Sequence, residues 1–337
     1  MSSLGDKLNR SRAWSVLGGT PTALLVALLL ILSIVLTVLV PGFGTDATFR
    51  TIMTSVGWID LIAVGTTVAL AAGAIDFSIT STAALAGVAL ASMGNAFGAA
   101  AGVLAALAVG LFVGLLNATL VVRFRLNPFL ATLATGSVIR GFSYTRSEFA
   151  NSGIPITDPT IDNAFGGLIA DAVPAVFVVL ALVTVGATVL MGLTRVGRRL
   201  LAVGGNQHAA RLSGISPDRT RAAAYLVSGL AASVAGMFLA GLLGSGLPAA
   251  ATGQELALFS AVLLGGTALW GGRANVVGAV VAVVLINAMY TGIVLAGLPN
   301  RLPGLISALL LLVSIWVSGR PSRVPSKVDD SMLAAGE

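Results

Sequence analysis

The sequence predicts an all-α integral membrane protein with about ten transmembrane helices and both termini in the cytoplasm. Three observations predict this fold class. Hydrophobic residues make up 56% of the 337 residues and charged residues only 9%, whereas a soluble domain has roughly 25% charged residues. The apolar stretches extend almost from end to end and have the ~20 residues that a helix needs to cross a bilayer. The basic residues, in addition, gather in alternate loops.

The apolar stretches give the helices in order. The first, residues 21–40, is too long for the core of a signal peptide and lacks a small-residue cleavage site, so we expect a permanent helix. The other nine are expected at 52–73, 77–93, 99–122, 128–145, 172–193, 221–243, 255–270, 275–297 and 302–318. Residues 21–318 then form one transmembrane domain, between a cytoplasmic segment at 1–20 and a polar cytoplasmic tail at 319–337.

The basic residues orient these helices. With the N-terminus inside, all but four of the 19 lysines and arginines fall in cytoplasmic segments. The four expected outside are Arg50, Arg140, Arg146 and Arg301. Membrane proteins generally carry such a basic excess on the cytoplasmic side. The net charge of +6 therefore indicates topology in a lipid membrane, and no nucleic-acid partner is expected.

Small and polar residues inside the spans have separate interpretations. Glycine and alanine recur every fourth residue from Gly98 to Ala118, a pattern typical of close helix packing. Asp60 is expected near the outer interface, where a carboxylate is solvated. Asp76 lies between two spans and is followed by hydroxyls that can cap the next helix. Further candidates, each expected to be a helix–helix hydrogen bonder or a boundary residue, are Asn117, Gln254, Glu255 and Asn287.

The residues for catalysis are largely missing. The chain has no cysteine and one histidine, His208, in an expected cytoplasmic loop. Lys7 and Lys327 are the only lysines, and neither follows the glycine-rich loop of an ATPase. We therefore expect no catalytic residue, no metal site and no ATP hydrolysis by this chain. The classes of membrane protein that remain are a channel, a carrier and a subunit of a larger assembly.

The loop after the sixth expected span has the form of a docking element. A basic arm at 195–199 leads to Gly204 and Gly205, which we interpret as a turn. Asn206 then fits the N-cap of a short alanine-rich helix, and Gly214 fits its C′ position. A short helix held between fixed ends on the cytoplasmic face suits contact with another protein.

Four segments together resemble one known family. The loop 204–215 reads GGNQHAARLSGI, 73–78 reads GAIDFS, 127–133 reads NPFLATL, and 261–273 reads AVLLGGTALWGGR. In this order and spacing they resemble the permease subunits of sugar-type ABC importers, the ribose, xylose, arabinose and galactose group. The chain departs from the usual family residues at Ala74, Phe77, Thr80, Ala134 and Ala274, which leaves the solute open.

The resemblance implies a multi-pass permease of the bacterial inner membrane. Its implied partners are a second permease subunit, an ATPase with two cassettes that binds ATP and Mg²⁺, and a periplasmic or lipid-anchored binding protein that delivers a monosaccharide or related polyol. No cofactor is implied in this chain. The residues implied to couple to the ATPase are Gly205, Asn206, Arg211, Ser213 and Gly214. Those implied to line the solute pathway are Asp76, Ser78, Asn127, Phe129, Thr132 and Thr267.

Several alternatives stay open at this point. An ABC permease for a nucleoside, a branched-chain amino acid or a sugar-derived signal has a related architecture. An ion-coupled secondary transporter would need buried acids, for which Asp76 and Glu255 are the candidates, and the docking loop would then go unexplained. The glycine cluster 265–272 has two equally good interpretations. It is either a bend that lines the pathway or a helix end followed by a tight turn.

Overall fold

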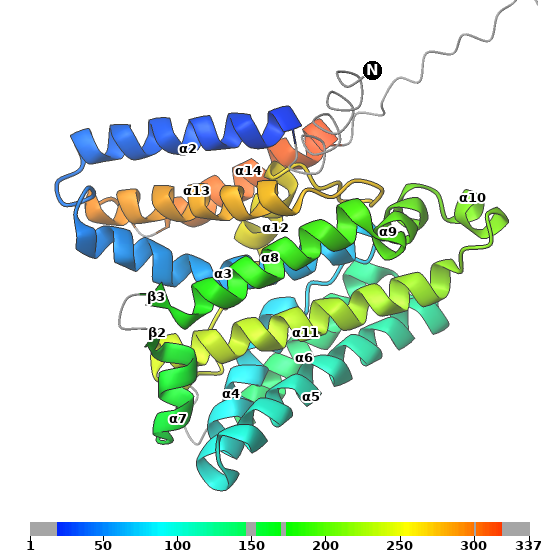
Figure 1. Cartoon of the computed structure of the whole chain (residues 1–337), viewed down its shortest axis with the longest axis horizontal. Coiled ribbons are helices and arrows are strands. Elements are labelled where there is room, and N and C mark those ends of the chain that lie inside the picture. The colour runs from blue at the N-terminus through cyan, green and yellow to red at the C-terminus, as the bar shows by residue number, and fades with distance from the viewer. Residues whose placement is uncertain (1–18, 146–152, 170–172, 300, 319–337) are drawn as a thin grey trace, which may run out of the picture.

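Helices make up most of the computed structural model, which describes residues 19–145, 153–169, 173–299 and 301–318 (Figure 1). The main helices are α2 (Gly19–Leu39), α3 (Asp46–Ala71), α4 (Ile79–Phe97), α5 (Ala99–Ala118), α6 (Pro128–Thr145), α8 (Ala175–Leu193), α9 (Arg195–Gly205), α10 (Gln207–Leu212), α11 (Pro217–Leu243), α12 (Glu255–Leu264), α13 (Val276–Leu295) and α14 (Leu302–Ser318). A π-helical turn at Thr119–Arg123 extends α5.

The remaining elements are short. Helix α7 (Pro159–Ile161) continues into a π-helical turn at Asp162–Gly166. Strand β1 (Ile154–Pro155) pairs antiparallel with β4 (Ser245–Gly246), and β2 (Leu168–Ile169) pairs antiparallel with β3 (Val173–Pro174). These pieces connect helix ends and form no larger sheet among the described residues.

Seven of the described helices are long and apolar enough to cross a membrane: α2, α3, α4, α5 with its π turn, α8, α11 and α13. Helices α12 and α14 are apolar but shorter. Helix α6 has 18 residues but contains Arg140 and several hydroxyl side chains. The all-α, multi-pass membrane class is confirmed, and a helix stands at each expected span. Ten crossings and cytoplasmic termini stay predictions.

Helix α3 occupies the centre of the bundle. Every residue from Asp60 to Ala71 is buried, because α8, α11, α12 and α13 pack around this helix. A helix enclosed on all sides needs no polar face. Asp60 is fully buried as well, so the expected position at a solvated interface is wrong.

Helices α4, α5 and α11 pack closely through their small residues. A Cβ atom at Gly110 of α5 would lie 2.2 Å from the backbone oxygen of Gly229 in α11, and one at Gly114 would lie 2.7 Å from that of Tyr225. Only glycine permits such an approach of two helix backbones. The expected packing role of the small residues in 98–118 is confirmed.

Three expected boundaries are wrong for identifiable reasons. Helix α12 ends at Leu264 rather than at 270, because Gly266, Gly271 and Gly272 have φ of +99°, +94° and +80°, values that favour glycine and end a helix. Helix α3 begins at Asp46, where the Thr45 side chain caps it. Helix α9 runs through to Gly205 where a turn was expected. The terminal segments 1–18 and 319–337 lie outside the described residues.

Candidate functional site

The larger cavity has a volume of about 980 Å³ and lies between the start of α4, α6, α12, α14 and the loop 265–275. Ligand pockets in proteins typically have about 300–1,000 Å³. Its polar lining includes Ser81, Asn127, Ser137, Tyr144 and Glu255. Amide and hydroxyl groups of this kind can hydrogen-bond a neutral polar solute.

Aromatic rings form an apolar wall of the larger cavity. Phe77 stacks on Phe259 with ring centroids 4.2 Å apart and an interplanar angle of 11°. Phe129 meets Phe77 edge-on, at 5.0 Å and 77°. The three rings come from the start of α4, from α12 and from α6, so they fix these elements against one another. Phe77 is one of the positions where the sequence departs from the family pattern.

An ion pair connects the helices at this cavity. Arg140 of α6 donates to Glu255 Oε1 of α12 at 3.2 Å, and the two side chains are only 16% and 22% exposed. Thr80 of α4 donates to the same oxygen at 2.5 Å, and Arg140 also donates to the hydroxyl of Thr252. Arg140 was expected outside as a topology marker, and with Gly141 it belongs to the family resemblance downstream of 127–133, but no contact was predicted for it. A charged residue inside an expected span was the signal that could have revealed this contact.

Asp76 organises a buried network behind the cavity. Its Oδ1 accepts hydrogen bonds from the Ser78 backbone N–H at 3.0 Å, the Ser78 hydroxyl at 2.6 Å and Asn117 Nδ2 at 3.2 Å. Its Oδ2 accepts from the Ser228 hydroxyl at 2.7 Å. A carboxylate satisfied in this way ties the turn before α4 to α5 and α11. The expected helix-bonding role of Asn117 is confirmed, whereas the Ser78 hydroxyl does not cap α4.

Only two of the six predicted pathway residues line the cavity. These are Asn127, whose Oδ1 accepts from the Phe129 N–H at 3.0 Å at the start of α6, and Phe129 itself. The other four, Asp76, Ser78, Thr132 and Thr267, are at most 3% exposed. The Thr132 hydroxyl accepts from the Phe77 N–H at 3.0 Å, and the Thr267 hydroxyl accepts from the Asn275 N–H at 3.2 Å. These four residues hold the walls in place rather than face the cavity.

Glycines from three distant segments meet behind this cavity. A Cβ atom at Gly204 of α9 would lie 2.0 Å from the Ala71 oxygen at the end of α3 and 2.5 Å from the Gly272 nitrogen. One at Gly271 would lie 2.7 Å from the Gly204 Cα and 2.9 Å from the Gly73 nitrogen. The Gly272 N–H donates to the Ala71 oxygen at 3.1 Å. We call this contact of Gly73, Gly204, Gly271 and Gly272 the glycine junction.

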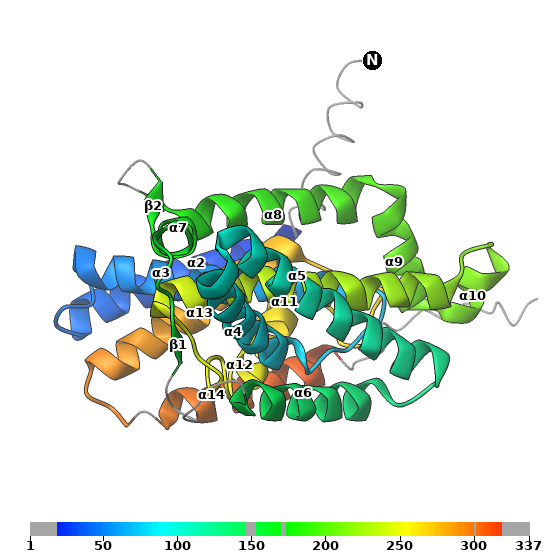
Figure 2. The ribbon, with the colours of Figure 1, turned by 90° about the horizontal axis from the view of Figure 1, so that it is seen from below.

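The predicted docking helix is α10, and its caps follow the sequence. Asn206 Oδ1 accepts from the Ala209 N–H at 3.0 Å. Gly214 has a φ of +77°, and the Ile215 and Gly214 N–H groups donate to the Ala210 and Arg211 oxygens at 3.0 Å each, which is a Schellman end. Figure 2 shows α10 projecting from the bundle. Of the predicted coupling residues, all five are exposed: Gly205, Asn206, Arg211, Ser213 and Gly214.

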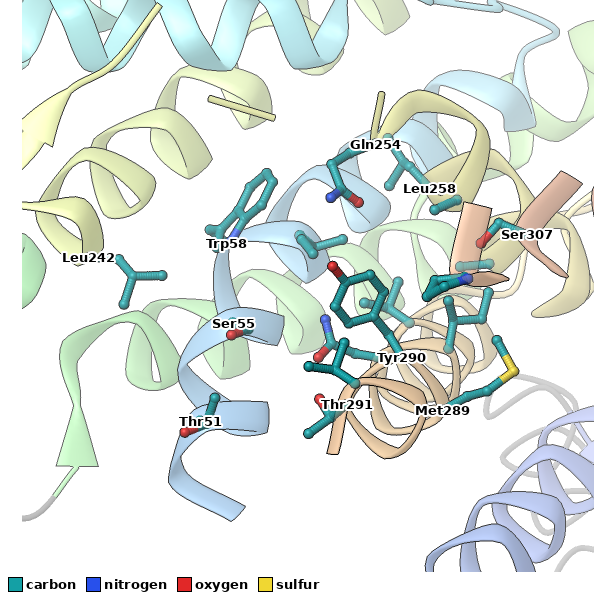
Figure 3. Close-up of a pocket in the computed structure, with 18 of the residues that line it drawn as sticks. Thr51, Ser55, Trp58, Leu242, Gln254, Leu258, Met289, Tyr290, Thr291 and Ser307 are labelled. Carbon is teal, nitrogen blue, oxygen red and sulfur yellow. The ribbon is translucent and has the colours of Figure 1, made fainter. Parts of the chain in front are cut away.

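A smaller cavity of about 510 Å³ lies on the other side of α12. Figure 3 shows Trp58 of α3, Gln254 and Tyr290 of α13 around this space. This cavity was not predicted, because its lining comes from residues far apart in the chain, from Thr48 to Ser307. Gln254 and Asn287 were each expected to be a helix–helix hydrogen bonder or a boundary residue; Gln254 is a boundary residue, at the N-cap of α12, and both line this cavity.

Asp60 stands apart from both cavities. It is fully buried in α3, and within the described part of the chain neither carboxylate oxygen has a hydrogen-bond partner. A buried polar group is costly unless it is bonded, and Asp60 lines neither cavity.

The chain has relatives among known proteins. The family described as "Branched-chain amino acid transport system / permease component" matches residues 48–315. The ribose import permease protein RbsC of Escherichia coli K12 is 33% identical over 299 residues, which are 88% of this chain and 92% of that protein. The L-arabinose ABC transporter permease protein AraH of Azospirillum brasilense is 32% identical, over 86% of this chain and 85% of that protein. No solved structure matches the chain.

Proposed function

The chain belongs to the family of branched-chain amino acid transport system permease components, and from this premise we propose that it is the transmembrane permease subunit of an ATP-driven importer for a monosaccharide or related polyol. The relatives named for ribose and L-arabinose import support the solute class. In this proposal a partner ATPase with two cassettes binds ATP and Mg²⁺, and a binding protein delivers the solute. In the same proposal, the chain lies in the bacterial inner membrane with its termini inside.

The glycine junction is the observation that carries this proposal. It brings α9, which leads into the exposed helix α10, into backbone contact with Ala71 at the end of α3 and with the loop 265–275, whose Gly271 in turn contacts Gly73. Gly73 and Trp270 of that loop line the larger cavity. Because packed interfaces have few alternative arrangements, a displacement of one element in this backbone contact moves the other element as well. Movement of α10 by a bound ATPase would therefore reach the cavity walls directly.

The exposed side chains of α10 suit contact with an ATPase. Leu212 is 79% exposed, and the adjacent Arg211 is exposed as well. An apolar side chain beside a guanidinium is a common composition at protein interfaces. In the proposal, this helix occupies a groove of the cassette subunit.

The larger cavity is the proposed solute route. Amides, hydroxyls and the stacked rings of Phe77 and Phe259 offer hydrogen bonds and a flat apolar face, which suits the polar edges and apolar faces of a sugar ring. Its wall helix α6 exposes Leu130, Val138 and Phe142 at 64%, 72% and 54%. We assign this apolar face to the second permease subunit, so that the route runs between two subunits.

Uptake by the reconstituted complex tests the proposal. The permease, the ATPase and the binding protein encoded with it would be placed in proteoliposomes with internal ATP, and uptake of radiolabelled D-ribose, L-arabinose and L-leucine measured. We expect ATP-dependent uptake of a sugar and none of leucine. Because the family description names branched-chain amino acids, leucine uptake without sugar uptake would overturn the assigned solute class.

A further inference from the structure

A third, wholly apolar groove of about 280 Å³ lies between α8, α3 and α11 and is closed at one end by α9. Only glycine and aliphatic side chains line it, among them Val68 of α3, Leu190 of α8, Leu200 of α9 and Val227 of α11. It contains none of the residues of the larger or the smaller cavity.

Small residues keep this groove open. Helix α8 packs on α3 and α9, and toward α11 it presents Gly186 and Ala187, opposite Ala223 and Ala231. A Cβ atom at Gly186 would meet no heavy atom within 4 Å. At membrane depth such a space contains no water, and an empty apolar space forfeits dispersion contacts. A hydrocarbon chain is the filling that the bilayer supplies.

Arginines surround the α9 end of the same groove. Arg195 and Arg199 are one helical turn apart on α9, and they flank the groove residues Val196 and Leu200. Arg219 of α11 lies one turn before the groove residue Ala223. All three arginines are exposed.

The charge of these arginines is not offset nearby. Among the described residues, the side chains of Arg195, Arg199 and Arg219 make no ion pair. The neighbouring Asp218 pairs with Arg125 at 2.9 Å. Arg198, by contrast, lies about 100° further round the α9 helix from Arg199 and donates to the Leu193 oxygen at 3.4 Å.

We propose that this groove binds one acyl chain of an anionic phospholipid of the inner leaflet, whose phosphate is held by Arg195 and Arg199 with Arg219 on the opposite rim. The inference rests on the proposed topology, which places α9 at the cytoplasmic surface. Guanidinium groups bind phosphate oxygens through paired hydrogen bonds, and basic residues at this surface attract anionic lipid. A bound lipid would hold the corner between α8 and α9, which Figure 2 shows reaching toward α11.

The test measures lipid retention by native mass spectrometry on the full-length chain alone. The purified, delipidated chain would be titrated with dioleoyl phosphatidylglycerol or dioleoyl phosphatidylcholine. Three variants accompany the wild type: the double variant Arg195→Gln/Arg199→Gln, the groove-filling variant Gly186→Leu, and the matched control Arg198→Gln. Circular dichroism melting would check that each variant is folded.

We expect one tightly retained phosphatidylglycerol in the wild type and in Arg198→Gln. Retention should be about 30-fold weaker in the double variant, the factor expected for two basic residues at an anionic surface, and it should be lost in Gly186→Leu. Equal retention of phosphatidylcholine, or equal losses in the control and the double variant, would overturn the proposal. So would a double variant that retains the lipid as tightly as the wild type does, because the arginines would then not hold its phosphate. None of these results depends on which solute is transported.

Discussion

Replacing Gly204 by alanine should uncouple ATP hydrolysis from transport. The added Cβ would lie 2.0 Å from the Ala71 oxygen and 2.5 Å from the Gly272 nitrogen, and both atoms belong to the backbone. Ordinary contacts begin at 3.4 Å, so α9 must retreat from α3 by roughly 1.4 Å. Overpacking of this kind costs about 1–3 kcal/mol. A transporter alternates between a conformation open to the inside and one open to the outside. If only one of these two conformations bears that cost, the equilibrium between them shifts about 5- to 150-fold.

The neighbouring glycine supplies the control: Gly205 is among the residues implied to couple to the ATPase, but an added methyl group removes no side chain that could contact a partner. A Cβ atom at Gly205 would meet only the Gly272 Cα, at 3.9 Å, so Gly205→Ala adds an ordinary contact. The assay compares ATPase stimulation by the loaded binding protein with solute uptake in proteoliposomes, at equal assembly of the complex. We expect Gly204→Ala to hydrolyse ATP but to lose most of the solute uptake that the loaded binding protein stimulates. Gly205→Ala should keep both ATP hydrolysis and uptake. Identical behaviour of the two variants would refute the role of the glycine junction.

Three further predictions concern the polar contacts around the cavities. Asp76→Leu should lower thermal stability by about 2–4 kcal/mol, because it leaves several buried donors unbonded, whereas Asp76→Asn should cost less; equal melting of both would contradict the network. In a double-mutant cycle on thermal stability, Arg140→Gln and Glu255→Gln should show a coupling of about 1 kcal/mol. Additive effects would mean that the ion pair does not stabilise the fold. Asn127→Leu should raise the KM for uptake several-fold and Asn287→Leu should not; the reverse result would move the solute route to the smaller cavity.

The helices were largely predictable because lipid imposes a strong rule on the sequence. A span needs about 20 apolar residues whatever surrounds it, so the stretches predicted at 21–40, 99–122 and 275–297 agree within two residues with α2, with α5 and its π turn, and with α13. The cap at Asn206 and the left-handed Gly214 were predictable for a similar reason. Each depends on residues within one turn of the chain.

The cavities and the buried network were not predictable in the same way. Asp76 was predicted to line the solute pathway, but it lies in a buried network, in which its partner Ser228 is 152 residues further along the chain. Asp60 was misplaced because apolar stretches do not say which helix stands at the centre of a bundle. Gly204 was interpreted as a turn, since a glycine that permits close approach looks the same in the sequence as one that ends a helix.

Helix α12 shows how one short element can serve both cavities. Gln254, just before its first turn, and Leu258 and Ala261 within it face the smaller cavity, whereas Glu255 and Phe259 face the larger one. This division follows from the helical period, since residues three and four apart share a face. The helix is held by the ion pair to Arg140 on one side and by the hydrogen bond from Ser260 to the Ser307 oxygen, at 2.8 Å, on the other. If α12 rotates to open the larger cavity, Glu255 must therefore either separate from Arg140 or move α6 with it. The same rotation changes the shape of the smaller cavity.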